Sequence, residues 1–134
     1  MPVANEVEAL LRIYYRALET GEALDRFYAT DEEAGNLGPV VKVGSGQGEF
    51  FVGHARVAAA VREVTETFAE NRLESRGPLL VRISGGLALF ADTVWWSGHT
   101  GGKAFASLTR WTGTARHTPR GWRFVQLHVS EEAA

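Results

Sequence analysis

Hydrophobic residues near the start of the chain recur at the period of an α-helix. They are Val7, Leu10, Leu11, Tyr14, Tyr15 and Leu18. This stripe predicts a long amphipathic helix, and Gly21 follows it at a position where helices commonly end. Further apolar residues predict a short second helix over residues 22–28 and a third helix from Gly53 to about Asn71.

The second half of the chain reads as strand after strand. Long strands are predicted over residues 79–84, 87–96, 104–116 and 122–130, and two shorter ones over 40–43 and 50–52. Because helices come first and hairpin-linked strands follow, the fold class is predicted to be α+β. We expect a strongly curved antiparallel sheet wrapped around the three helices, in a single domain over residues 1–134.

The last strand is apolar on both faces. Simple alternation places Trp122, Phe124, Gln126 and His128 on one face and their neighbours on the other. A strand of this kind must be covered on both sides. We therefore expect helices on the inner face and a homodimer partner on the outer face.

A glycine-rich segment, Gly44 to Gly48, separates the two short strands. A phosphate cradle would need a lysine and a hydroxyl residue after the glycines, or a final glycine where Glu49 stands. Neither condition is met, so a hairpin loop is the better interpretation.

Composition excludes several kinds of function. A formal net charge of −2 without a basic stripe argues against nucleic-acid binding, and the absence of cysteine excludes thiolate chemistry. No run of about 20 apolar residues is present, so neither a membrane span nor a membrane partner is expected. The four histidines show no metal-ligand spacing. We expect a cytoplasmic protein without metal or cofactor.

Three stretches together resemble the SnoaL-like branch of the nuclear-transport-factor-2-like superfamily. They are the opening helix around Leu10–Leu18, the Phe51-Val52-Gly53-His54 entry to the third helix, and the closing strand Gly121–Ser130. In that strand a tryptophan is followed six residues later by a histidine, as in calmodulin-dependent kinase association domains. The resemblance implies a cystatin-like cone with a central pocket, commonly dimerised through the outside of its sheet.

The resemblance does not extend to the steroid isomerase chemistry that some members of the superfamily perform. Steroid isomerases of the superfamily have a tyrosine near the position of Tyr14, but they also need a carboxylate base on an early strand. The corresponding segment here, Asn36 to Val43, contains no Asp or Glu. The fold itself hosts enzymes, ligand binders and association modules, so it does not decide the function.

Two residues are candidates for catalysis. His128 could act as an acid or base because imidazole titrates near neutrality, or it could be a buried neutral histidine. Asp92 interrupts an apolar strand, where a carboxylate needs a partner. If both face inward they would form an acid–base dyad; otherwise Asp92 lies at a strand edge or pairs with an arginine.

Five residues are candidates for ligand binding: Tyr14, Trp96, Arg110, Gln126 and His128. Trp95 and Trp96 should point to opposite faces, and we place Trp96 inside with Phe90 and Asp92, although the opposite phase stays open. Three hypotheses follow. The protein binds a small, largely apolar molecule, or it is an association module without catalysis, or it is a cyclase, dehydratase or isomerase that uses His128.

Overall fold

The computed structural model describes residues 4–132, and its elements alternate little between helix and strand. The helical elements are α1 (Ala4–Thr20), the 3-10 turn η1 (Asp25–Phe27), α2 (Asp31–Ala34), the 3-10 turn η2 (Gly35–Leu37) and α3 (His54–Thr67). The strands are β1 (Val41–Val43), β2 (Phe50–Val52), β3 (Phe68–Ser75), β4 (Leu80–Ser84), β5 (Leu87–Thr100), β6 (Lys103–Thr118) and β7 (Gly121–Glu131). The predicted α+β class is confirmed.

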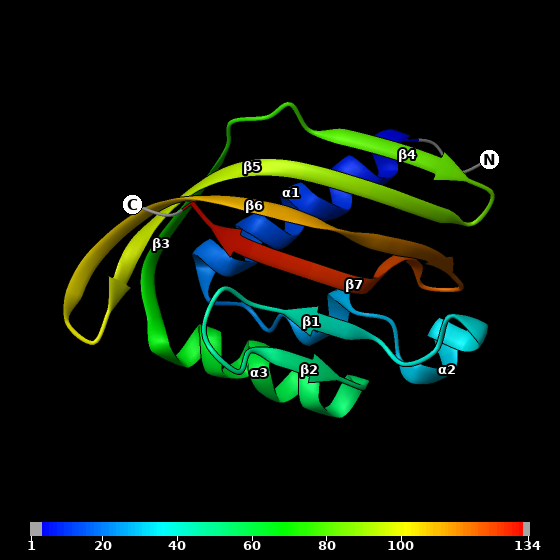
Figure 1. The fold of residues 1–134 in the computed structure, drawn as a ribbon, viewed down its shortest axis with the longest axis horizontal. Helices are drawn as coiled ribbons and strands as arrows, with labels where there is room; N and C mark the ends of the chain where they lie inside the picture. The colour runs from blue at the N-terminus through cyan, green and yellow to red at the C-terminus, as the bar shows by residue number, and fades with distance from the viewer. Residues whose placement is uncertain (1–3, 133–134) are drawn as a thin grey trace.

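The strands form one sheet in the order β2-β1-β7-β6-β5-β3, with β4 also paired to β5 (Figure 1). Long hairpins join β5, β6 and β7, which cross the middle of the sheet. The sheet is mixed and not purely antiparallel, because β1 lies parallel to β7.

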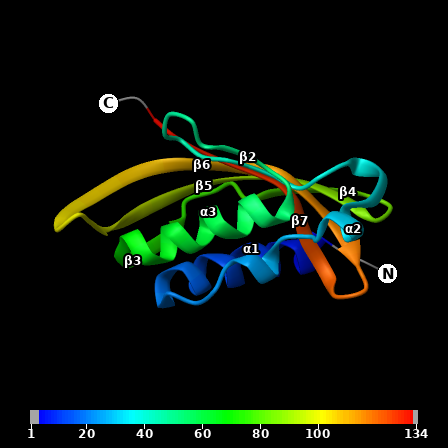
Figure 2. The same cartoon turned by 90° about the horizontal axis from the view of Figure 1, so that it is seen from below.

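Both long helices lie on one face of the sheet, which arches over them (Figure 2). The amphipathic stripe of α1 is buried as predicted, with Val7 and Leu11 fully covered. Val57 and Val61 of α3 and Phe124 of β7 complete this apolar layer. No helix within residues 4–132 is long and apolar enough to cross a membrane.

The predicted helices differ from the structure in two places. The short second helix is only the 3-10 turn Asp25–Phe27, and a separate four-residue helix, α2, follows it. The third helix stops at Thr67, because residues 68–75 pair with β5 as strand β3. The hydrophobic period continues to Phe68, so a local pattern could not separate the last helical turn from the first strand residues.

A β-bulge in β7 changes which residues face the helices. Thr114 of β6 pairs with Gln126, but the next residue, Ala115, pairs with Phe124, so Val125 is an extra residue. Phe124 and Leu127, three positions apart, both belong to the main core, whereas simple alternation would separate them. The predicted face of Trp122, Phe124, Gln126 and His128 is therefore wrong beyond Phe124.

Candidate functional site

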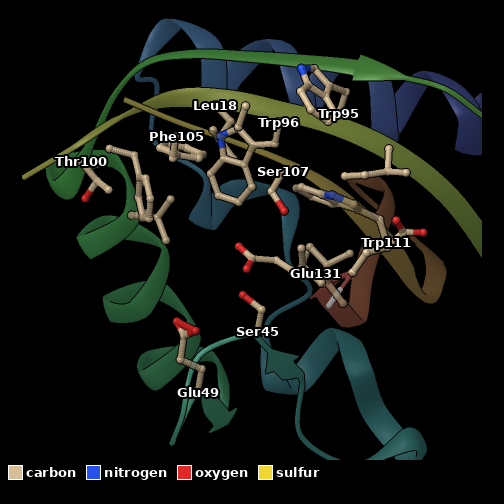
Figure 3. Close-up of a pocket in the computed structure, with 18 of the residues that line it drawn as sticks. Leu18, Ser45, Glu49, Trp95, Trp96, Thr100, Phe105, Ser107, Trp111 and Glu131 are labelled. Atoms are coloured by element: carbon tan, nitrogen blue, oxygen red, sulfur yellow. The ribbon is translucent and has the colours of Figure 1, made fainter. Parts of the chain in front are cut away.

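A cavity of about 640 Å³ lies between the sheet and the two long helices (Figure 3). Its walls come from α1, α3, the start of β3, the β1–β2 hairpin and one end of β5, β6 and β7. The lining residues are Tyr14, Leu18, Lys42, Gly44, Ser45, Glu49, Val64, Phe68, Trp95, Trp96, Thr100, Phe105, Ala106, Ser107, Leu108, Trp111, Leu127, Val129, Glu131 and Glu132.

Aromatic rings form one wall of this cavity. The Trp96 ring centroid lies 5.3 Å from Phe68, 5.7 Å from Phe105 and 6.3 Å from Trp111. The Trp96 Nε1 donates a hydrogen bond to Asn71 Oδ1 at 2.9 Å, and the Trp111 Nε1 donates to a threonine hydroxyl. Because both indole N–H groups already have acceptors, these rings offer the cavity mainly apolar surface.

The two neighbouring tryptophans of β5 point to opposite sides of the strand (Figure 3). Trp96 lines the cavity on the same strand face as the buried Phe90 and Asp92, in agreement with the favoured phase. Trp95 also borders the cavity, and the Arg76 guanidinium lies 5.4 Å from the centre of its ring. Trp95 alternates with Trp96 along β5 and lies on the other side of that strand from the Trp96 ring (Figure 3), so its contact with a partner subunit stays a prediction.

Tyr14 is fully buried beside the cavity and shares a hydrogen bond with Tyr28, with their hydroxyl oxygens 2.8 Å apart. Its ring meets Phe124 edge-on at 5.2 Å and Trp111 at 5.9 Å. Burial raises the pKa of both hydroxyls, so neither acts as a base near neutral pH. The pair can only exchange hydrogen bonds as neutral phenols.

The opposite side of the cavity is polar, and the sequence patterns did not reveal it. Lys42 of β1 is only 9% exposed, and burial lowers the pKa of its ammonium. Glu49 of the β1–β2 hairpin and Glu131 of β7 lie across from the aromatic wall (Figure 3). The sequence did contain one indication of this polar side, because the charged Lys42 interrupts the apolar run Val40–Val43.

Asp92 lies inside the fold, but it does not line the cavity. Its carboxylate accepts hydrogen bonds from the Tyr15 hydroxyl and the Ser75 hydroxyl, each at 2.9 Å, and from the Thr93 backbone N–H. Asp92 therefore does not lie on an edge strand, and its carboxylate forms no ion pair with an arginine among residues 4–132, so both of these alternatives are wrong. It also forms no dyad with His128.

Three predicted ligand-binding residues lie away from the cavity. Gln126 and His128 alternate with the cavity-lining Leu127 and Val129 after the bulge, so they are on the outer face of the sheet. Arg110 is exposed between two buried residues of β6 and shares that outer face. The predicted placement of Arg110, Gln126 and His128 in the pocket is therefore wrong. Of the five predicted ligand-binding residues, only Tyr14 and Trp96 line the cavity.

The structure shows no candidate metal site among residues 4–132. No three His, Cys, Asp or Glu side chains gather there as a set of ligands. The β1–β2 loop is a hairpin as predicted, closed by a backbone hydrogen bond from Gly44 to Glu49. It brings Ser45 and Glu49 to the cavity, a contribution that its glycine pattern did not indicate.

Neither a protein-family model nor a curated protein matches the sequence. Solved structures do match in shape. A proposed dehydratase of the NTF2-like family from Streptomyces avermitilis is 23% identical with a TM-score of 0.87, over 98% of this chain and 96% of its own. A proposed calcium/calmodulin-dependent protein kinase II association domain from Xanthomonas campestris is 18% identical with a TM-score of 0.78, over 98% and 89%.

A third structure, an NTF2-like protein with a cystatin-like fold from Novosphingobium aromaticivorans, is 21% identical with a TM-score of 0.69, over 95% of this chain and 80% of its own. Identities this low establish the architecture and not the activity. The chain therefore has the nuclear-transport-factor-2-like fold that its three resembling stretches together implied.

Proposed function

We propose that the protein binds a small, largely apolar molecule with an aromatic body in the cavity between α1, α3 and the sheet. The observation that supports this best is the cavity itself. Its volume of about 640 Å³ falls in the range of small-molecule sites, which combine apolar walls with a few polar groups. The aromatic wall around Trp96 and the polar side around Lys42 meet that description.

A fluorescence titration tests the proposal, because Trp96 and Trp111 lie in the wall and a bound aromatic ligand should quench them. The probe is 2-naphthalenemethanol, followed in parallel by thermal unfolding. A ligand at 100 times its Kd adds about 2.7 kcal/mol of stability. Saturable quenching with a matching rise in Tm supports the proposal, and neither effect at millimolar probe contradicts it.

Two variants make the titration specific to the cavity. Ser107→Phe adds a ring at a lining position and should abolish quenching. Thr112→Phe places the same ring at an exposed position on the same strand and should leave the affinity unchanged. Equal loss in both variants would contradict binding inside the cavity.

A homodimer through the outer sheet face is the second candidate, as an association role with or without a ligand. Leu89 and Leu80 are 60% and 43% exposed and lie on paired strands. The match to an association domain fits the same idea. Sedimentation should give a dimer at micromolar concentration. Leu89→Arg should yield monomers, whereas Ile13→Arg on the exposed side of α1 should not.

Catalysis by His128 loses its structural basis once that residue lies on the outer face. A dehydratase-like role, suggested by the Streptomyces neighbour, would have to use the groups that line the cavity. Activity that survives His128→Ala is the outcome we expect if any such reaction exists.

A further inference from the structure

Lys42 is an unusual residue in this chain. The sequence contains twelve arginines and only two lysines, Lys42 and Lys103. Lys103 is exposed where β6 begins, whereas Lys42 lines the cavity and is 9% exposed. In the β1–β7 register Lys42 faces Leu127, which lines the same cavity. The fold thus places one of its two side-chain amines inside the proposed ligand site.

The Lys42 amine has no hydrogen-bond or ion-pair partner among residues 4–132. Glu49 is the counter-charge that acts on it, but the Glu49 carboxylate accepts the Gly46 backbone N–H within the hairpin. Burial lowers the pKa of the amine more than Glu49 raises it. A desolvated lysine of this kind carries more neutral, nucleophilic amine than an exposed one.

The charges around the cavity select the kind of ligand. Glu49, Glu131 and Glu132 line it together with the single ammonium of Lys42. Three carboxylates against one lysine disfavour a carboxylate or phosphate ligand. Tyr14 is the remaining titratable lining group, and its hydroxyl is neutral and bonded to Tyr28. A neutral molecule with an aromatic body and a group that reacts with an amine fits these walls.

We infer that Lys42 captures neutral aromatic aldehydes or ketones in this cavity as an imine. The inference rests on the proposed ligand-binding function. The amine lone pair adds to the carbonyl carbon, and the C=O π pair moves to oxygen, which takes one of the two protons that the nitrogen carried. The resulting carbinolamine loses the nitrogen proton and its hydroxyl as water, which leaves a C=N bond. Amine and carbonyl give imine and water, with no oxidant or reductant, and Glu49 is the nearby carboxylate that can carry the proton.

Reductive trapping with 2-naphthaldehyde and cyanoborohydride tests this step, followed by intact mass and peptide mapping. We expect one adduct per chain, on Lys42, formed several times faster than on Lys103, which serves as an internal reference. Lys42→Arg should remove the fast adduct, and Lys103→Arg should keep it. Equal or faster labelling of Lys103 or of the N-terminal amine would overturn the inference.

The alcohol 2-naphthalenemethanol, which cannot form an imine, separates the two proposals. It should bind the cavity and slow labelling of Lys42 but not of Lys103. Binding of the alcohol without fast labelling of Lys42 by the aldehyde would overturn the imine and leave the ligand-binding proposal standing. If neither compound enters the cavity, both proposals fail. The anion 2-naphthoate should bind several times more weakly than the alcohol, and tighter binding would contradict selection of neutral ligands.

Discussion

The hydroxyl of Tyr15 donates a hydrogen bond to Oδ2 of Asp92 at 2.9 Å and so ties α1 to β5. Both residues are buried, and Ser75 of β3 donates to the other carboxylate oxygen. A single carboxylate therefore joins the first helix to two strands of the sheet. Burial and, after it, the nearby Asp92 carboxylate raise the pKa of Tyr15, so the phenol remains a donor across the neutral range.

Removing this donor should destabilise the fold without affecting the cavity. We expect Tyr15→Phe to lower the free energy of unfolding by about 1–3 kcal/mol, because a buried carboxylate loses one of its donors. Urea unfolding measures the change, and a double-mutant cycle with Ser75→Ala should show coupling, since both hydroxyls bind the same carboxylate. Strictly additive effects would mean that the two bonds are independent.

Gly113 should not tolerate a side chain. A Cβ there would meet the Gln126 carbonyl oxygen and lie 2.7 Å from Phe90 Cζ. Gly113→Ala should cost about 1–3 kcal/mol by overpacking next to the β7 bulge. Gly86→Ala is the matched control, because nothing lies within 4 Å of a Cβ at that turn position. Comparable Tm values for the two variants would contradict the close approach of β6 and β7.

The ion pair between Glu33 and Arg120 should make the free energy of unfolding depend on pH in the acidic range. The Arg120 guanidinium contacts both Glu33 carboxylate oxygens, at 2.7 and 2.8 Å, and holds the pKa of Glu33 at about 2 instead of 4.5. The lowered pKa means that this stabilisation is complete above pH 4.5 and disappears as the pH falls from 4.5 to about 2.

Glu33→Gln should therefore lower stability by about 1 kcal/mol at pH 7, and the difference from the wild type should shrink through that acidic window. The exposed Glu32, on the same helical turn, provides the control variant Glu32→Gln. Circular dichroism melts between pH 2 and 7 measure both differences. A difference that stays constant with pH would argue against the ion pair.

The buried charge of Lys42 should destabilise the folded state at every pH at which its amine is protonated in the folded chain. Burial lowers its pKa below 10.5, so the unfolded chain binds more protons than the folded one between the two pKa values. Lys42→Met should raise the free energy of unfolding by about 1 kcal/mol at pH 7, and this gain should vanish as the pH approaches 10.5. Lys103→Met, at an exposed site, should show no such trend. A destabilised Lys42→Met would contradict the cost of burying the charge.

Local patterns were sufficient for most of the fold. The 3.6-residue stripe of α1 and the turn glycines between β4 and β5 each act over a few neighbouring residues, so the sequence determined these elements and their order. The closing strand and the helix order also predicted the curved α+β architecture. Alternation along one uninterrupted strand placed Phe90, Asp92 and Trp96 on the same face, and the structure shows that Phe90 and Asp92 are buried, as in the favoured phase.

Only the tertiary structure decided which polar groups reach the cavity. The bulge at Val125 arises from pairing between β6 and β7 and moves Gln126 and His128 to the outer face. Lys42 enters the cavity because β1 pairs in parallel with β7, a contact between residues more than eighty positions apart. Register depends on partner strands and not on a strand's own sequence, so alternation alone could neither remove His128 from the site nor place Lys42 in it.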